Sequence, residues 1–416
     1  MNRPDEVSSP DLARLVARHS YAWLVAANLV GAWLALSLLW PAAGDALAPL
    51  TYGRWVPLHL DWQLYGWCSL PIVGALLAWC AAPADARTLT SARVALTSWS
   101  LVLVLGGLTW LAGGVSGKLF LDWAGNARPL LPAAMLVLWG ALARLTAGAW
   151  KTFPPAGRAL RVIVLAALLP VPVVLHWSMG REVYPAVNPD SGGATGAALL
   201  GSTLGIVTIF LLLPHLLRVV PRGSPARRTA IMFALGASWL VFAIIDHGHV
   251  SHHASVPIAA LALLVIWIPL LGVHWRGFEW PTEARAWMWA ALAWWTLLIA
   301  SGWVTFLPGV SESLKFTHGL VGHAHLAMAG VVTSVNGMIL ATLTRRTADR
   351  LAFWRWHVGC GVYVAAMVVL GVFETERAGE LFRSAGWTQA LLSLRLVGGL
   401  LMLDASVRWW RDAGKP

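Results

Sequence analysis

Long apolar runs separated by short polar linkers make up almost the whole chain. A helix needs roughly 20 apolar residues to cross the hydrocarbon core of a bilayer. Twelve runs reach about this length, so the pattern predicts an all-α, polytopic membrane protein with twelve transmembrane helices. The predicted spans cover residues 21–42, 59–82, 93–113, 129–148, 160–178, 197–217, 229–250, 256–275, 286–307, 318–343, 354–373 and 388–407.

The composition agrees with this prediction. Of the 416 residues, 58% are hydrophobic and 12% are charged, whereas about a quarter of the residues in a soluble domain are charged. We therefore expect the lipid bilayer to be the main partner of the chain. No small-residue cleavage site follows the first apolar run, so we expect this run to stay as a span and not to be removed as a signal peptide.

The basic residues predict an orientation. The formal net charge is +11, but the Lys and Arg side chains lie in short loops and form no basic stripe with interleaved aromatics, which excludes a nucleic-acid partner. Cytoplasmic loops of membrane proteins are enriched in Lys and Arg. Most of the basic residues fall on one side if both termini are cytoplasmic. We therefore expect a cytoplasmic segment over 1–20, a membrane domain over 21–407 and a cytoplasmic tail over 408–416.

Histidines gather at one predicted depth. Polar side chains within a membrane are costly, and they usually face a bundle interior, a cavity or a cofactor. The alternative is that histidines at helix ends only meet interfacial water. The histidines of this layer open the second span, end the seventh and open the tenth: His59; His247, His249, His252 and His253; His318, His323 and His325.

Two histidines of the tenth span stand two residues apart. Residues at this spacing point about 200° apart on a helix, so His323 and His325 cannot share one metal ion. They can each serve a different cofactor on opposite faces of the helix, because a neutral imidazole is a common axial ligand of heme iron. The spacing therefore favours two separate ligand positions.

Four segments carry a resemblance to a known family. The chain resembles subunit I of the heme-copper oxidases, and within this superfamily the C-family (cbb-type) cytochrome c oxidases and the nitric oxide reductases. The tenth-span motif His323-Ala324-His325 is the most specific part of the match. The matching segments are residues 52–59, 316–326, 353–367 and 394–399, and their order along the chain agrees with that family.

The resemblance implies a set of heme ligands. His59 and His325 would be the axial ligands of a low-spin heme b, and His323 would bind a second, high-spin heme. Arg54 and Arg395 would bind heme propionates, since a guanidinium binds a carboxylate through two parallel hydrogen bonds. The resemblance implies a redox protein of the bacterial inner membrane that passes electrons from heme b to an O2- or NO-binding site. The chain contains no CxxCH motif, so the expected electron donor is a separate cytochrome c or cytochrome c-bearing subunit.

The sequence departs from this family where the family binds copper. Ser202 stands at the position of a copper-ligating histidine on the sixth helix, and Phe242 stands at the position of a redox-active tyrosine. His249, His252 and His253 could still hold copper or another non-heme metal ion in a rearranged geometry. The alternative for these histidines is a hydrated polar helix end.

Three functions therefore remain open. The first is an oxidase-like or nitric oxide reductase-like enzyme, and the second is a non-catalytic heme protein for electron transfer or gas binding that has lost the copper site. The third is a transporter, against which we weigh the lack of interrupted helices in matching halves of the sequence. Asp61 and Asp122 are expected near outer span ends, where they orient neighbouring side chains.

Overall fold

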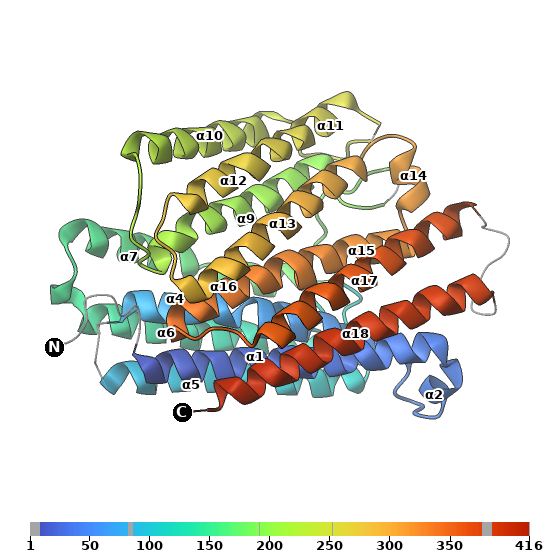
Figure 1. Cartoon of the computed structure of the whole chain (residues 1–416), viewed down its shortest axis with the longest axis horizontal. Coiled ribbons are helices and arrows are strands. Elements are labelled where there is room, and N and C mark those ends of the chain that lie inside the picture. Colours follow the sequence, from blue (N-terminus) through green and yellow to red (C-terminus); the bar gives the residue numbers. More distant parts are fainter. Residues whose placement is uncertain (1–8, 82–85, 191, 252, 377–384, 416) are drawn as a thin grey trace. The chain divides into compact units, whose positions relative to one another are not determined.

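The structure is a computed structural model that describes residues 9–81, 86–190, 192–251, 253–376 and 385–415. It is all-helical, and within these residues it contains twelve helices that are long and apolar enough to cross a membrane (Figure 1). The predicted fold class, a polytopic twelve-helix membrane protein, is therefore confirmed. Lipid contact and an integral membrane location follow from the same spans.

The chain divides into two compact units, each formed by more than one segment. Unit 1 comprises Met1–Val183, Ile339–Gly359 and Leu392–Pro416, and unit 2 comprises Tyr184–Met338 and Cys360–Leu391. The helices up to residue 183 are α1 (Pro10–Leu39), α2 (Pro41–Asp45), α3 (Tyr52–Asp61), η1 (Trp62–Cys68), α4 (Leu70–Cys80), α5 (Ala86–Leu111), η2 (Gly125–Ala127), α6 (Leu130–Gly148), η3 (Trp150–Thr152), α7 (Pro155–Leu168) and α8 (Val171–Ser178).

The remaining helices belong to unit 2 or contribute to both units. They are α9 (Gly196–Leu216), α10 (Pro225–Ile244), α11 (Ser255–Ala262), η4 (Leu263–Ile266), α12 (Trp267–Arg276), α13 (Thr282–Val304), α14 (Val310–Leu314), α15 (His318–His325), η5 (Leu326–Val332), α16 (Thr333–Thr344), α17 (Arg350–Glu376) and α18 (Gly386–Ala413). The isolated bridges at Val187 and Pro221 form no strand in the part of the chain described.

The first helix begins earlier than its apolar run predicts. The Ser9 hydroxyl accepts a hydrogen bond from the Leu12 amide (3.3 Å), and Pro10 occupies the first turn, where its missing N–H costs nothing. Asp11 in the same turn favours the positive end of the helix dipole. Local capping therefore extends α1 beyond the membrane-length run that began at residue 21.

The predicted seventh span, which corresponds to α10, ends earlier than expected. The apolar run reaches residue 250, but α10 stops at Ile244, and Ile245 is extended. The Asp246 carboxylate accepts a hydrogen bond from the Gly248 amide (2.8 Å), a local contact that competes with helix continuation. The histidines that were expected at the end of this span therefore lie on the following loop.

Three spans contain an irregular helical segment. The π-helical segment η1 interrupts the span Tyr52–Cys80, and η5 interrupts His318–Thr344; a 3-10 segment, η4, divides α11 from α12. Pro71 and Pro269 follow η1 and η4, and a proline ring clashes with the carbonyl four residues before it, which displaces the regular hydrogen-bond pattern. The argument against a transporter, the lack of interrupted helices in matching halves of the sequence, therefore loses its basis, since three spans contain irregular segments.

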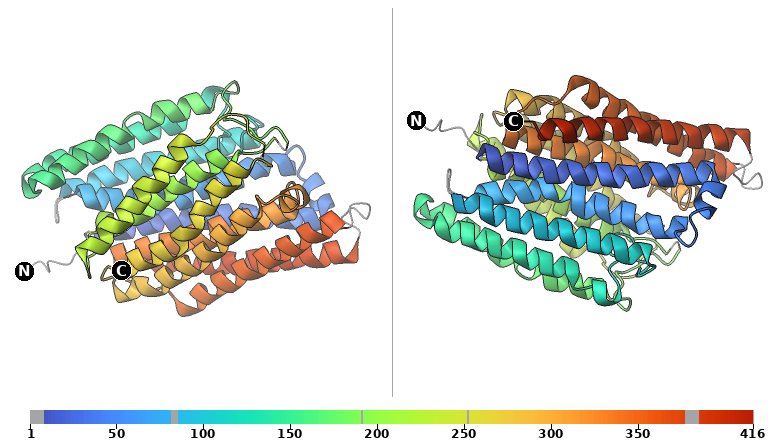
Figure 2. Two further views of the ribbon diagram at one scale, coloured as in Figure 1. Left: turned by 90° about the horizontal axis from the view of Figure 1, so that it is seen from above. Right: turned by 90° about the horizontal axis from the view of Figure 1, so that it is seen from below.

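Small residues allow α1 to pack closely against the η1–α4 span in unit 1 (Figure 2, right). A Cβ atom on Gly74 would lie 2.3 Å from the Val16 Cγ1 atom, and one on Gly66 would lie 2.8 Å from the Trp23 Cβ atom. Close backbone approach at small residues is a common basis of helix association in membranes, where lipid tails are as apolar as the side chains.

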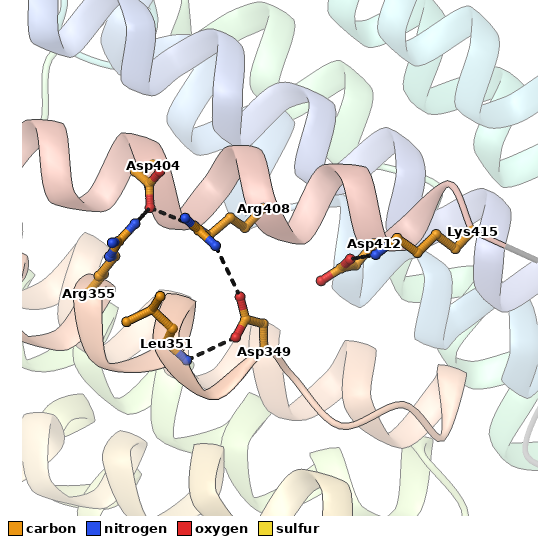
Figure 3. A network of polar contacts seen from close by, with 7 residues as sticks. All are labelled: Asp349, Leu351, Arg355, Asp404, Arg408, Asp412 and Lys415. Atoms are coloured by element: carbon orange, nitrogen blue, oxygen red, sulfur yellow. Dashed lines mark hydrogen bonds and ion pairs between the residues drawn. The ribbon is translucent and has the colours of Figure 1, made fainter.

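Ion pairs join α17 to α18 within unit 1 (Figure 3). Asp404 on α18 binds Arg355 on α17 and, at 2.8 Å, Arg408 one turn along its own helix. Arg408 also reaches Asp349 (3.8 Å), whose second oxygen accepts a hydrogen bond from the Leu351 amide (2.9 Å) and caps α17. The network links both helices through side chains that alternate in charge.

The close approach at Gly74 makes a stability prediction. Gly74→Ala should lower the free energy of unfolding by about 1–3 kcal/mol, because the added methyl group overpacks against the stiff Val16 side chain. Gly140→Ala on α6 is the matched control, since a Cβ there meets nothing within 4 Å. Thermal unfolding in detergent should show a lower midpoint for the first variant only, and equal midpoints would contradict this packing.

Candidate functional site

A fully buried carboxyl group lies inside the second span. Asp61, the last residue of α3, has 0% exposure, and neither of its carboxyl oxygens has a hydrogen-bond partner among the residues described. An ionised carboxylate in such surroundings is very unfavourable unless it is paired. Asp61 was expected near an outer span end as a residue that orients its neighbours; in the structure it is fully buried within the span Tyr52–Cys80.

The loop after α5 covers this carboxyl. Trp123 lies close enough to act on Asp61, yet its own indole N–H also has no hydrogen-bond partner within the described part of the chain. Its ring is fully buried and packs edge-on against Trp110 (centroids 4.9 Å apart) and Tyr65 (6.3 Å). The Tyr65 hydroxyl donates its hydrogen bond to the Phe120 carbonyl oxygen (2.7 Å), so it does not donate one to the Asp61 carboxyl.

Asp122 is the second acid of this site. It is 3% exposed, accepts a hydrogen bond from the Gly117 amide (3.1 Å) and lies near enough to Asp61 for the two charges to repel. Burial raises the pKa of the Asp122 carboxyl above its ordinary value, and hydrogen bonds from Gly117 and Ser116 offset part of the rise. The two acids are therefore unfavourable as a doubly ionised pair.

Lys118 anchors the loop that carries Asp122 and Trp123. Its ammonium group donates to the carbonyl oxygens of Ser178 (2.8 Å), Gly180 (2.5 Å) and Val183, which follow α8. Three carbonyl acceptors match the three N–H donors of a lysine, so its charge is stabilised without a carboxylate. The sequence analysis does not single out Lys118, although an acid inside an apolar run is a signal for this site.

His59 and the two predicted arginines lie in unit 1. The His59 Nδ1 atom is 2.8 Å from the Ala27 carbonyl oxygen, so Nδ1 carries the proton and the carbonyl accepts it. The ring fits against Gly31, where a Cβ would be only 2.7 Å from His59 Cε1. Arg54 donates to the Leu111 carbonyl oxygen (2.8 Å), and Arg395, 8% exposed, is near enough for its charge to act on His59.

His323 and His325 lie in unit 2 and face different helices. The His323 Nδ1 atom is 3.2 Å from the Ser301 hydroxyl on α13. The His325 Nδ1 atom is 2.8 Å from the Val321 carbonyl oxygen, and its ring stacks on Tyr363 of α17 with centroids 4.2 Å apart. The two rings thus diverge, as their spacing predicts.

The candidate metal ligands lie on the loop after α10. His249 pairs through Nδ1 with the backbone of Val187 (3.1 and 3.2 Å), and His253 is 3.3 Å from the Glu312 carboxylate. His252 lies outside the described residues. Where the structure describes the chain, no group of three or more His, Cys, Asp or Glu side chains could hold a metal ion.

The comparisons with known proteins point away from an oxidase. No family model matches the chain. The tetracycline resistance protein, class E, of Escherichia coli is 32% identical over 101 residues. This match covers 22% of the present chain and 23% of that protein, so it does not establish a family.

The expected activity is therefore corrected. The interpretation as a heme-binding redox protein, with iron binding, electron transfer and a place in a respiratory chain, is wrong: the chain matches part of a tetracycline resistance protein, and no metal-ligand group occurs in the part of the chain described. The resemblance to heme-copper oxidases, the two hemes and the cytochrome c donor are not tested by these findings and stay predictions.

Asp122 makes a pH-dependent stability prediction. Because its pKa is raised in the folded protein, the carboxyl favours folding in its protonated form, and this contribution is lost as the pH rises from about 3.9, the ordinary value, through the raised value. The unfolding midpoint of the wild type relative to Asp122→Asn should therefore be highest near pH 4 and fall toward pH 8. Asp45→Asn, at an exposed carboxyl, controls for the loss of a charge. A wild-type advantage that grows with pH would contradict the assignment.

Proposed function

We propose that this chain is a membrane transporter that couples the movement of a small molecule to a proton carried by Asp61. The observation that carries the proposal is the fully buried Asp61 carboxyl, which has no hydrogen-bond partner among the described residues. A charge at this place would be unstable, so the carboxyl holds a proton while its surroundings stay closed.

Release of this proton requires a change of structure. The carboxylate becomes stable only when water or a hydrogen-bond donor reaches it, and this links its protonation state to the conformation of unit 1. Asp122 on the covering loop is near enough for the two charges to repel, and this repulsion favours a state in which only one of the two acids is ionised. The unpaired Trp123 N–H is a donor that could stabilise the ionised form of Asp61 after a small shift.

The helix geometry supports the same proposal. The π-helical segment η1 begins at Trp62, directly after Asp61, and unit 2 has its own π-helical segment, η5, directly after His325. π-helical turns inside α-helices occur mostly at functional positions, and interrupted membrane helices often line transport sites. Each unit therefore has one span whose backbone hydrogen bonds are irregular beside a polar side chain.

The partial similarity to a tetracycline resistance protein supports a substrate class. A membrane protein can give resistance by moving a compound out of the cell, so we propose that the solute is an amphipathic small molecule of this kind. The distribution of Lys and Arg supports cytoplasmic termini, because basic loops stay on the cytoplasmic side, and the bacterial origin of the similar protein supports a bacterial inner membrane. Export would then run from the side of the termini.

Transport by purified protein in vesicles tests the proposal. A pH gradient should drive tetracycline across the membrane, with a matching proton flux reported by an enclosed pH dye. Asp61→Asn should reduce the gradient-driven flux by about tenfold or more, an effect that needs a loss of only about 1.4 kcal/mol. Asp61→Glu, which keeps the carboxyl, should keep part of the flux.

The exposed Asp45 provides the control for this experiment. Asp45→Asn removes the same charge elsewhere in unit 1 and should transport like the wild type. If Asp61→Asn also kept the full gradient-driven flux, the role of Asp61 would be wrong. If no pH gradient drove any flux of tetracycline or of related amphipathic compounds in the wild type, the transport function itself would be wrong.

A further inference from the structure

Unit 1 contains a cavity that the proposed transport step does not use. Its volume is about 460 Å³, within the range of small-molecule sites in proteins. It lies beside the first turns of α1, the beginning of α5 and the end of α18. The residues that line it are Asp11, Arg14, Leu15, Arg18, His19, Ala22, Leu89, Arg93 and Trp410.

The polar wall of this cavity is strongly basic. Arg14, Arg18 and Arg93 face a single acid, Asp11, which lies 3.8 Å from Arg14 in an exposed and therefore weak pair. Within the described part of the chain, Arg18 and Arg93 have no ion-pair partner. Three guanidinium groups around one space repel each other, and an anion between them would remove this repulsion.

His19 adds a hydrogen-bond donor to this wall. Its Nδ1 atom is 2.9 Å from the Ser100 hydroxyl, which also accepts a hydrogen bond from the Trp23 indole N–H (3.0 Å). The Ser100 hydroxyl can donate its own proton to His19 Nδ1 while it accepts from Trp23, and in this arrangement the proton of the neutral ring is on Nε2. The cavity is therefore lined by donors, with one carboxylate among them.

The remaining wall is apolar. Leu15, Ala22, Leu89 and Trp410 complete the lining, and the adjoining α5 carries exposed apolar side chains such as Val94 and Leu101. Tryptophan is enriched where membrane proteins meet lipid headgroups. A ligand that fits both walls has a compact anionic group for the basic wall. If the ligand is a lipid, its acyl chains can contact the apolar wall.

We propose that this cavity binds a phosphate group, with the guanidinium groups of Arg14, Arg18 and Arg93 as its ligands. Arginine matches phosphate oxygens through paired N–H donors, and basic pockets between membrane helices bind anionic lipid headgroups. The phosphate can belong to an anionic phospholipid or to a free phosphate compound. In either case it ties the ends of α1, α5 and α18 together.

Native mass spectrometry of the purified protein in detergent tests this site. Added phosphatidylglycerol should stay bound in preference to phosphatidylcholine, which has no net charge. The double variant Arg18→Gln/Arg93→Gln should weaken phosphatidylglycerol binding by at least about tenfold, since the loss of even one hydrogen bond to a charged group costs about a factor of ten. Arg227→Gln, at an exposed arginine of unit 2, should bind like the wild type.

A second variant keeps the test decisive if the double variant folds poorly. Ala22→Trp fills the cavity without changing its charge, so it should reduce phosphatidylglycerol binding while the protein elutes as a single species. Equal retention of the two lipids by the wild type, or full binding by both cavity variants, would overturn the proposal. Neither outcome depends on transport, so this site and the proposed function are tested separately.

Competition distinguishes the two sources of the phosphate. If millimolar glycerol 3-phosphate or inorganic phosphate displaces phosphatidylglycerol, the site recognises the phosphate alone and a free compound can occupy it. If neither displaces the lipid, the apolar wall contributes to recognition and the ligand is the phospholipid. Both results support a phosphate site, and they assign its occupant.

Discussion

The cost of leaving a polar group unpaired away from water governs this structure. In a bilayer each helix must satisfy its own backbone, so twelve helices are nearly the whole of the described fold. The same cost acts on side chains: Lys118 is held by three carbonyl oxygens, and His59 and His325 each contact a backbone carbonyl oxygen. Asp61 is an exception, because its buried carboxyl oxygens have no hydrogen-bond partner among the described residues. This exception is the basis of the proton-carrying role proposed for unit 1.

The sequence predicted the spans well because their signal is a sum over many residues. A run of about 20 apolar residues is hard to explain by anything but a membrane helix. The ends of the spans were less predictable, because they depend on single contacts such as the Ser9 cap of α1 and the Asp246 turn after α10. Each of these contacts depends on a single side chain, so it does not change the average hydropathy from which the spans are predicted.

The candidate site was harder to predict from the sequence than the fold. Asp61 could be seen inside an apolar run, but its burial depends on Trp123, which lies about 60 positions later and is positioned by Lys118. The histidine layer was visible as a pattern, yet in the structure His253 pairs with Glu312 and His249 with backbone groups of Val187. Spacing along the chain could not reveal these partners, because they come from other segments.

The ion pairs between α17 and α18 restrict how unit 1 can move (Figure 3). Arg408 contacts Asp404 one turn before it and Asp349 at the beginning of the other helix, while Asp404 also binds Arg355. Sliding one helix along the other by a single turn would separate the pairs that join them, each of which is partly exposed and therefore weak on its own. Together the three pairs favour one axial register of the two helix ends. A change of register would have to exchange these pairs together, because Arg408 and Asp404 each take part in two of them.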